Sequence, residues 1–240
     1  MTKYIAVVSG KGGAGKTTCT ANIGHALFAL GKKVVLLDAN LATPNLSLQL
    51  GLMEPKGTLN NFLRKEKSLA EITHAHESGI SIIPSSPSYS EFQKTQKNDS
   101  LNLSEIFEHL DETAEFVLVD SPGGLGSDVE QVLKNTDEAI IVVNPNLSSV
   151  VDGLKTIMLA KSSNNTIAGI ILNMTNGGRN ELAPAEVEKM LGHPIIANVK
   201  SHRKVRKAAH RQMPLNHLYP RSRLAKEFMK VAKHLTYEQP

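Results

Sequence analysis

The fold of this chain is decided by residues 10–17, which read Gly10-Lys11-Gly12-Gly13-Ala14-Gly15-Lys16-Thr17. They satisfy the pattern G-x-x-x-x-G-K-[ST], follow a short apolar run over 4–8 and precede a helical pattern over 16–30. A strand, a glycine-rich turn and a helix in this order form a phosphate-binding loop, because glycines let backbone N–H groups converge on phosphate oxygens. The helix adds its positive N-terminal end to the same anion. The stretch therefore predicts a nucleotide site.

The polar side chains of this loop have distinct expected roles. We expect Lys16 to neutralise the β and γ phosphates and the Thr17 hydroxyl to bind Mg²⁺. A carboxylate that holds the same ion should end a later strand, and Asp120 does so after the apolar run 116–119. The loop residues expected to contact the nucleotide are Gly10, Lys11, Gly12, Gly13, Ala14, Gly15, Lys16, Thr17 and Thr18.

Short apolar runs rich in β-branched residues recur along the chain, with helical patterns between them. Continuous apolarity, as over 140–143, is typical of strands that are covered on both faces. We therefore predict an α/β fold, a doubly wound and mainly parallel sheet with helices on both faces. The predicted strands cover 4–8, 34–37, 80–83, 116–119, 139–143, 167–172 and 195–199, and the predicted helices 16–30, 101–110, 148–161, 183–191 and 222–236.

Helix boundaries and loops follow from a few residue types. Ser148-Ser149 is expected to cap the helix over 148–161, and Pro184 and Gly192 to open and close the helix over 183–191. The segment 85–100 is rich in Ser, Gln, Lys and Asn, which predicts a mobile loop. Without a repeat or a linker, the 240 residues are expected to form a single domain over 1–240.

Composition excludes several classes of protein. Hydrophobic residues make up 40% and charged residues 21%, values that disfavour a disordered, collagen-like or coiled-coil chain. The single cysteine, Cys19, forbids an internal disulfide and a cysteine-ligated metal or iron–sulfur site within one chain. No apolar run approaches the roughly 18 residues of a spanning helix, and the N-terminus leads into a strand pattern. We expect a cytoplasmic protein, free or associated with the nucleoid or the membrane.

Charge is distributed unevenly along the chain. Residues 1–188 contain 15 Lys/Arg and 21 Asp/Glu, a balance of −6, whereas residues 189–240 contain 12 and 2, a balance of +10. If the most basic segment is helical, Arg203, Lys207 and Arg211 share one stripe. The face is then a solvated one, a site for non-specific DNA binding, or a site for anionic lipid headgroups. The patch consists of Lys200, Arg203, Lys204, Arg206, Lys207 and Arg211.

Taken together, these motifs resemble the MinD/ParA family of deviant Walker A ATPases, and within it archaeal MinD-like proteins. The likeness rests on Lys11 in the loop, on Val34-Val35-Leu36-Leu37-Asp38-Ala39-Asn40, on Asp120-Ser121-Pro122 and on 137–155. It implies a P-loop ATPase that binds ATP or ADP with Mg²⁺, forms a homodimer with ATP and acts as a positioning switch for a division site, a cargo or DNA. In the family the signature lysine, here Lys11, reaches the partner's nucleotide, where a cation stabilises the phosphoryl transition state.

The resemblance also assigns the acidic motif after the second predicted strand. Asp38 is expected to support the metal-bound water, so the metal candidates are Thr17, Asp38 and Asp120. Asn40 occupies the place of an Asp that orients the attacking water in the family. Because an amide carries no charge and accepts no proton, slow hydrolysis is expected. The catalytic candidates are thus Lys11, Lys16, Asp38 and Asn40, and the alternative is a nucleotide-dependent regulatory or scaffold module with negligible hydrolysis.

Two further expectations concern the base and the membrane. Asn173 follows a predicted strand and either contacts adenine, as in related proteins, or only forms a strand-end turn. The apolar pattern over 222–236 favours a helix that covers the sheet over a membrane anchor, so membrane binding of the MinD type is not expected. The sequence names no activating partner.

Overall fold

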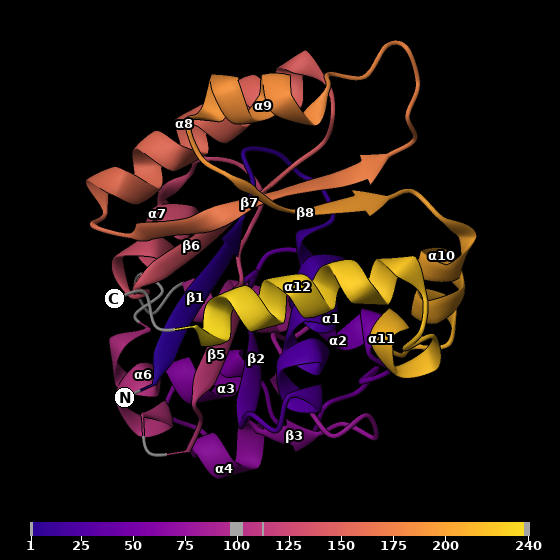
Figure 1. The fold of residues 1–240 in the computed structure, drawn as a ribbon. Helices are drawn as coiled ribbons and strands as arrows, with labels where there is room; N and C mark the ends of the chain where they lie inside the picture. Colours follow the sequence, from indigo (N-terminus) through magenta and orange to yellow (C-terminus); the bar gives the residue numbers. More distant parts are fainter. Residues whose placement is uncertain (1, 97–102, 112, 238–240) are drawn as a thin grey trace.

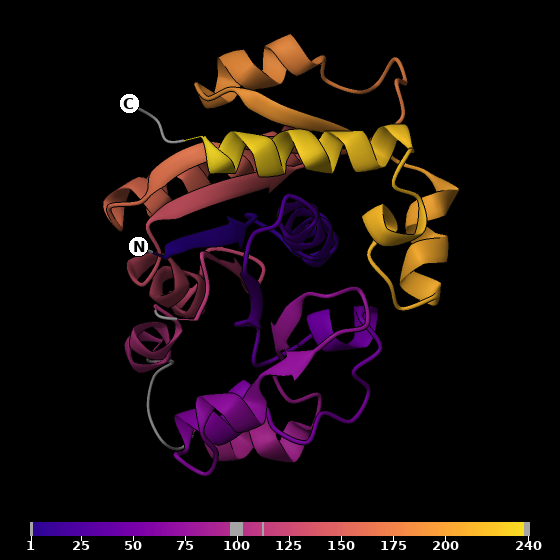
Figure 2. The same ribbon diagram turned by 60° about the horizontal axis from the view of Figure 1, so that its bottom comes forward.

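The computed structural model describes residues 2–96, 103–111 and 113–237. An eight-stranded sheet runs through it and helices cover both faces, which confirms the predicted α/β fold (Figures 1 and 2). The strand order is β3-β4-β2-β5-β1-β6-β7-β8, and among the strands of the described residues only β3 pairs antiparallel to its neighbour. The strands are β1 (Lys3–Val8), β2 (Val34–Asp38), β3 (His74–Ala75), β4 (Ser81–Ile83), β5 (Phe116–Asp120), β6 (Glu138–Val143), β7 (Thr166–Thr175) and β8 (Ile195–Lys200).

One or more helices separate most successive strands along the chain. They are α1 (Lys16–Ala29), α2 (Leu46–Gln49), α3 (Leu59–Leu63), α4 (Leu69–Ile72), α5 (Tyr89–Gln96), α6 (Ser104–Leu110), α7 (Ser127–Lys134), α8 (Leu147–Ser162), α9 (Pro184–Leu191), α10 (Arg203–His210), α11 (Leu215–Leu218) and α12 (Arg223–Thr236). All seven predicted strands are present. The two-residue strand β3 and the helices of four or five residues, α2, α3, α4 and α11, are too brief to produce a periodic pattern, which is why the sequence did not indicate them. Helix α7, with eight residues, was not predicted either.

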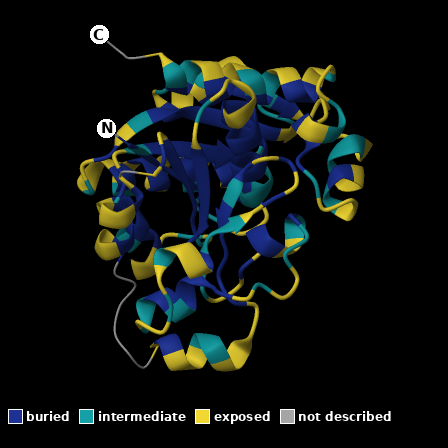
Figure 3. Ribbon diagram, turned by 90° about the horizontal axis from the view of Figure 1, so that it is seen from below, coloured by how far each residue is buried: buried dark blue, intermediate teal, exposed yellow. Residues whose placement is uncertain are grey.

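The sheet separates two apolar layers, because successive residues of a strand point to opposite faces. Ile5 and Val7 pack in the layer with α1 and α12, and Ala6 and Val8 in the layer with α7 and α8. Figure 3 shows the strands as the buried centre of the molecule. Phe228 of α12 is fully buried against this centre, so the helix over 223–236 covers the sheet as predicted. Among the described residues, none of the helices has the length and apolar character needed to cross a bilayer.

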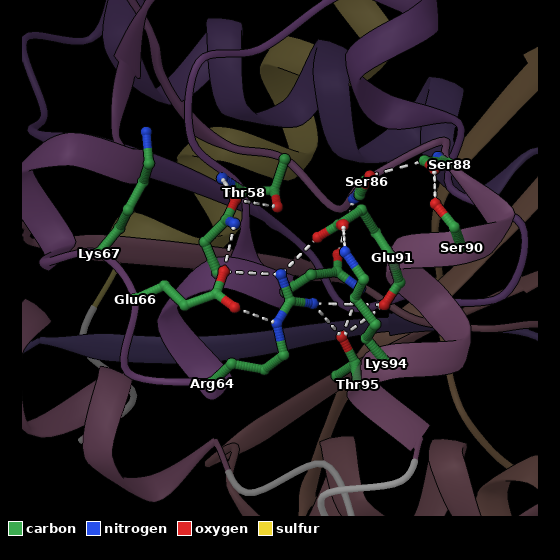
Figure 4. A network of polar contacts seen from close by, with 12 residues as sticks. Thr58, Arg64, Glu66, Lys67, Ser86, Ser88, Ser90, Glu91, Lys94 and Thr95 are labelled. Atoms are coloured by element: carbon green, nitrogen blue, oxygen red, sulfur yellow. Dashed lines mark hydrogen bonds and ion pairs between the residues drawn. The ribbon is translucent and has the colours of Figure 1, made fainter.

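The prediction of a loop over 85–100 is wrong for its central part, where α5 forms, and residues 97–100 lie outside the described residues. Arg64 holds this helix in place (Figure 4). Its side chain is only 6% exposed, forms ion pairs with Glu66 and Glu91 and donates to Thr95 Oγ1 at 2.9 Å. Because α5 is polar and depends on a partner far away in sequence, its own composition resembled that of a loop.

Two helix boundaries also differ from the predictions. The N-cap of α8 is Asn146, whose Oδ1 accepts a hydrogen bond from Ser149 N at 2.9 Å, and not Ser148-Ser149. The helix expected over 101–110 is described from residue 104 onward, and its first expected residues lie outside the described ones. By contrast, α9 begins at Pro184, and Gly192, with φ 66°, caps its C-terminal end, as predicted.

Candidate nucleotide-binding site

Residues 9–15 connect β1 to α1 at the carboxyl edge of the sheet, where the backbone takes shapes that require glycine. Gly13 and Gly15 have φ of 80° and 98°, values that side chains disfavour. A Cβ on Gly15 would lie 2.2 Å from Asn173 Nδ2, and one on Gly10 would lie 2.6 Å from the Cβ of Asp152 in α8. Asn173 and α8 therefore pack tightly against the loop, and the loop residues that line the cleft are free to face a ligand.

Lys16 is the buried cation of this loop. It is 7% exposed, and its Nζ donates to Ser9 Oγ at 2.9 Å. Burial lowers the pKa of Lys16, and the nearby Asp120 opposes this effect. Among the described residues, the ion pairs do not include this ammonium group. A buried ammonium group held only by a hydroxyl is suited to meeting an anion.

Two carboxylates lie side by side next to the loop. Asp38 and Asp120 end the neighbouring strands β2 and β5, face each other in register, and are 0% and 2% exposed. Thr17 Oγ1 donates to Asp120 Oδ2 at 2.6 Å. Burial raises the pKa of both carboxyl groups, and the nearby Asp120 raises that of Asp38 further. Two buried carboxylates and a hydroxyl are oxygen ligands of the kind that Mg²⁺ prefers, so the donor set fits a magnesium ion.

A cleft of about 520 Å³ opens above the loop. This volume lies in the range of roughly 300–1,000 Å³ that is usual for small-molecule sites. Four segments line the cleft: the loop and the start of α1, the stretch after β2, the stretch after β5, and α10 through Ala209. The sequence had not indicated Gln49 or Ala209 as lining residues, because neither belongs to a local motif. These two residues reach the cleft only because tertiary packing brings α2 and α10 next to the loop.

Asn40 is fixed in a turn directly after β2. Its Nδ2 donates to Thr43 O at 2.8 Å and to Thr43 Oγ1 at 3.1 Å, and its Oδ1 accepts from Thr43 N at 3.1 Å. Both ends of the amide are thus engaged locally, while the residue still lines the cleft. An aspartate here would keep the bond from Thr43 N but would have no hydrogen to donate to Thr43 O.

Asn173 packs against the phosphate loop at Gly15. It is 5% exposed and lies within β7, which continues to Thr175, so it does not form a strand-end turn. Its Nδ2 donates to Ala14 O at 2.8 Å. The side chain therefore supports the phosphate loop directly, and its contact with adenine stays a prediction.

The predicted basic patch includes the surface of α10, so the segment whose helicity the sequence left open is a helix over Arg203–His210. Its members divide between two hollows. One hollow of about 420 Å³ is surrounded by the residues named here the basic cluster: Arg203, Arg206, Lys207, His210 and Arg211. Lys200 and Lys204 line a second hollow instead, and the Nζ of Lys204 lies 5.2 Å from the ring centroid of Tyr219. The basic cluster therefore contains the predicted stripe of Arg203, Lys207 and Arg211, but Lys200 and Lys204 of the predicted patch lie outside it.

The fold and this site define a nucleotide-binding P-loop protein, and comparison with known proteins places the chain more closely. Residues 2–169 match the family model described as an AAA domain. An uncharacterized ATP-binding protein of Methanocaldococcus jannaschii is 36% identical over 231 residues, 96% of this chain and 86% of the relative. A putative septum site-determining protein MinD of Emiliania huxleyi is 31% identical over 90% of this chain and 80% of its own length. The chain belongs to the MinD/ParA family.

A solved structure supports the same assignment. The septum site-determining protein MinD of Pyrococcus horikoshii, complexed with Mg-ADP, superposes with a TM-score of 0.92 at 31% identity, over 98% of this chain and 96% of the other. The resemblance inferred from Lys11, Asp38 and Asp120 is thus confirmed at the level of the family.

Proposed function

We propose that this chain is a Mg-ATP-dependent switch that dimerises with ATP, hydrolyses it slowly and positions another component inside the cell. The observation that carries the proposal is the buried Asp38–Asp120 pair beside Lys16 and the glycine loop. Burying two carboxylates costs free energy that a bound cation offsets, so the site is built for a cation-bearing phosphate ligand. Light-scattering mass measurement with ADP and with ATP, together with phosphate release, tests the proposal.

The surface next to the loop supports the dimer. Four large apolar residues on one face of α8 are exposed by 39 to 66%: Leu147, Val151, Leu154 and Met158. Their spacing of four, three and four residues forms one stripe along the helix. The same helix packs against the phosphate loop, since a Cβ on Gly10 would meet Asp152. We take the stripe as part of the surface that a second copy covers when it approaches the loop.

Replacing Lys11 by alanine should leave ATP binding to the monomer almost unchanged but remove the ATP-dependent dimer. Lys11 is half-buried in the loop, while the buried Lys16 provides the cation inside the same subunit. Molar mass measured with ATP checks the prediction, and Lys33→Ala, on an exposed lysine away from the loop, is the control. A Lys11→Ala protein that still dimerises and hydrolyses normally contradicts a role across the interface.

Replacing Asn40 by aspartate should raise hydrolysis by about 10-fold, equivalent to about 1.4 kcal/mol of barrier. The new carboxylate can orient and polarise the attacking water, although the turn to Thr43 loses the donor bonds of the amide. Single-turnover hydrolysis measures the effect. Asn40→Ala removes these donor bonds, and the bond from Thr43 N as well, without adding a carboxylate, and it should not show the gain. Equal or lower activity for Asn40→Asp means that the site is built around the amide.

The second candidate is a nucleotide-dependent scaffold with negligible turnover. It is favoured by the engagement of Asn40 with Thr43, which holds the amide in a local turn. The switch and the scaffold would each need a surface that binds another cellular component. We assign this role to the basic cluster on α10 and duplex DNA as its partner, because the spread of positive charge suits a phosphate backbone.

A further inference from the structure

The short helix α2 and the basic helix α10 both border the nucleotide cleft. Its N-terminal end is held by a side chain of the site: Asp38 Oδ2 accepts from Asn45 N at 3.2 Å and from Leu46 N at 3.0 Å. None of its own side chains caps this end. The position of α2 therefore depends directly on the Asp38 carboxylate.

The other end of α2 leads to α10. A Cβ on Gly51 would lie 3.1 Å from the Cβ of Gln212, two residues beyond the last residue of α10. Gln212 Nε2 also lies 3.6 Å from Met53 Sδ. Along its length, α2 is tied to the start of α1, since Gln49 Nε2 donates to Thr18 Oγ1 at 2.9 Å.

Helix α10 is held weakly by its own packing. Of its eight residues only Ala208 is buried, whereas α11 behind it is fixed to α1 through Asn216 and Asn22, with contacts of 3.2 and 3.1 Å. Ala209 of α10 and Leu48 and Gln49 of α2 line the same cleft. A ligand that fills the cleft therefore meets both helices at once.

We propose that α2 is a strut that transmits occupancy of the cleft to α10, so that the nucleotide sets the position of the basic cluster. The inference rests on the proposed function for the identity of the ligand. When Asp38 turns toward a bound cation, its Oδ2 cannot keep both N–H groups of α2 in the same geometry, since hydrogen bonds weaken steeply with misalignment. Helix α2 has only one turn, so a displacement of its N-terminal end also moves its C-terminal end and Gly51, which lies against Gln212.

A reversible cross-link tests the strut. The double variant Gly51→Cys/Gln212→Cys places two thiols where the two Cβ atoms would lie 3.1 Å apart, and Cys19, the one native cysteine, is buried. The reduced form has the same strain at Gly51 and serves as the matched control. Hydrogen exchange of residues 203–211 is measured with and without Mg-ATP, with α9 as an internal reference on the other layer.

The strut predicts that Mg-ATP changes exchange in 203–211 by several-fold in wild type and in the reduced variant, and not in the disulfide form. The variant Gln212→Gly, which needs no cross-link and removes the Cβ that faces Gly51 at a position with φ 57°, should also lose the response while it still binds ATP in calorimetry. An unchanged α10 in ATP-bound wild type, or a full response in the disulfide form or in Gln212→Gly, overturns the strut alone. Absence of ATP binding to wild type overturns the proposed function and the strut with it.

Discussion

Replacing Lys16 by alanine should reduce affinity for Mg-ATP by at least about 100-fold, equivalent to roughly 3 kcal/mol. The ammonium group is 7% exposed at the base of the cleft and is held toward the loop by Ser9 Oγ at 2.9 Å. Hydrogen bonds to charged groups are worth about 1.5–3 kcal/mol each, and several phosphate oxygens lose their partner at once. The loop glycines remain, but their N–H groups carry no full charge.

Calorimetric titration with Mg-ATP measures this loss. The exposed Lys33 lies just before β2, away from the loop, so Lys33→Ala changes net charge equally without touching the cleft. A second control is urea unfolding of the nucleotide-free variant. Because removing Lys16 leaves Asp120 without its neighbouring cation, a modest loss of stability is expected. Unchanged ATP affinity in Lys16→Ala contradicts the assignment of the loop.

Reversing the charge of Arg203, Arg206 and Lys207 to Glu should abolish binding to duplex DNA without changing affinity for ATP. The basic cluster faces no carboxylate of its own segment, because the sequence has none between Glu188 and Glu227. If one cluster neutralises about four phosphates, raising salt from 50 to 200 mM weakens binding by roughly 100-fold. In an ATP dimer two clusters act together, which adds about one to two decades when both engage.

The measurement is a gel-shift titration with a random-sequence duplex at several salt concentrations, with ADP and with ATP. The matched control reverses Lys226, Lys230 and Lys233, which are exposed on α12 and change net charge by the same amount. Retention of DNA by wild type and by this control, but not by the cluster variant, supports DNA as the partner. Capture by anionic phospholipid vesicles instead favours the membrane, and capture by neither leaves the cluster as a solvated face.

What the sequence predicted well depends on local patterns. The loop over 10–17 needs glycines at fixed offsets for its backbone shape, and Asp38 and Asp120 end apolar strands whose carboxyl ends meet at one edge. The amino-acid sequence alone is therefore enough to predict that the loop, Asp38 and Asp120 lie close together. The continuous apolar runs likewise indicate strands buried on both faces, because a strand with one face in water would alternate apolar and polar residues.

What the sequence did not predict depends on contacts between distant segments. Helix α5 is stabilised by Arg64, and the cleft takes Ala209 from a helix far along the chain. The basic residues around α10 are close together in sequence, yet Lys204 does not belong to the basic cluster, because its side chain lies over Tyr219. Charge counting gives the sign of such a surface, whereas tertiary packing decides which of its side chains face outward together.

The Asp38–Asp120 pair also links this protein's survival to its ligand. Two carboxyl groups buried side by side make the folded state less stable when no cation lies between them. A ligand that binds only the folded chain stabilises it by about 2.7 kcal/mol at a free concentration 100 times its Kd. When nucleotide is scarce, the unfolded fraction is therefore expected to rise, and proteases remove unfolded chains first. Because the site is expected to take ADP as well as ATP, the abundance of the chain should follow the total nucleotide supply and not the ratio of ATP to ADP.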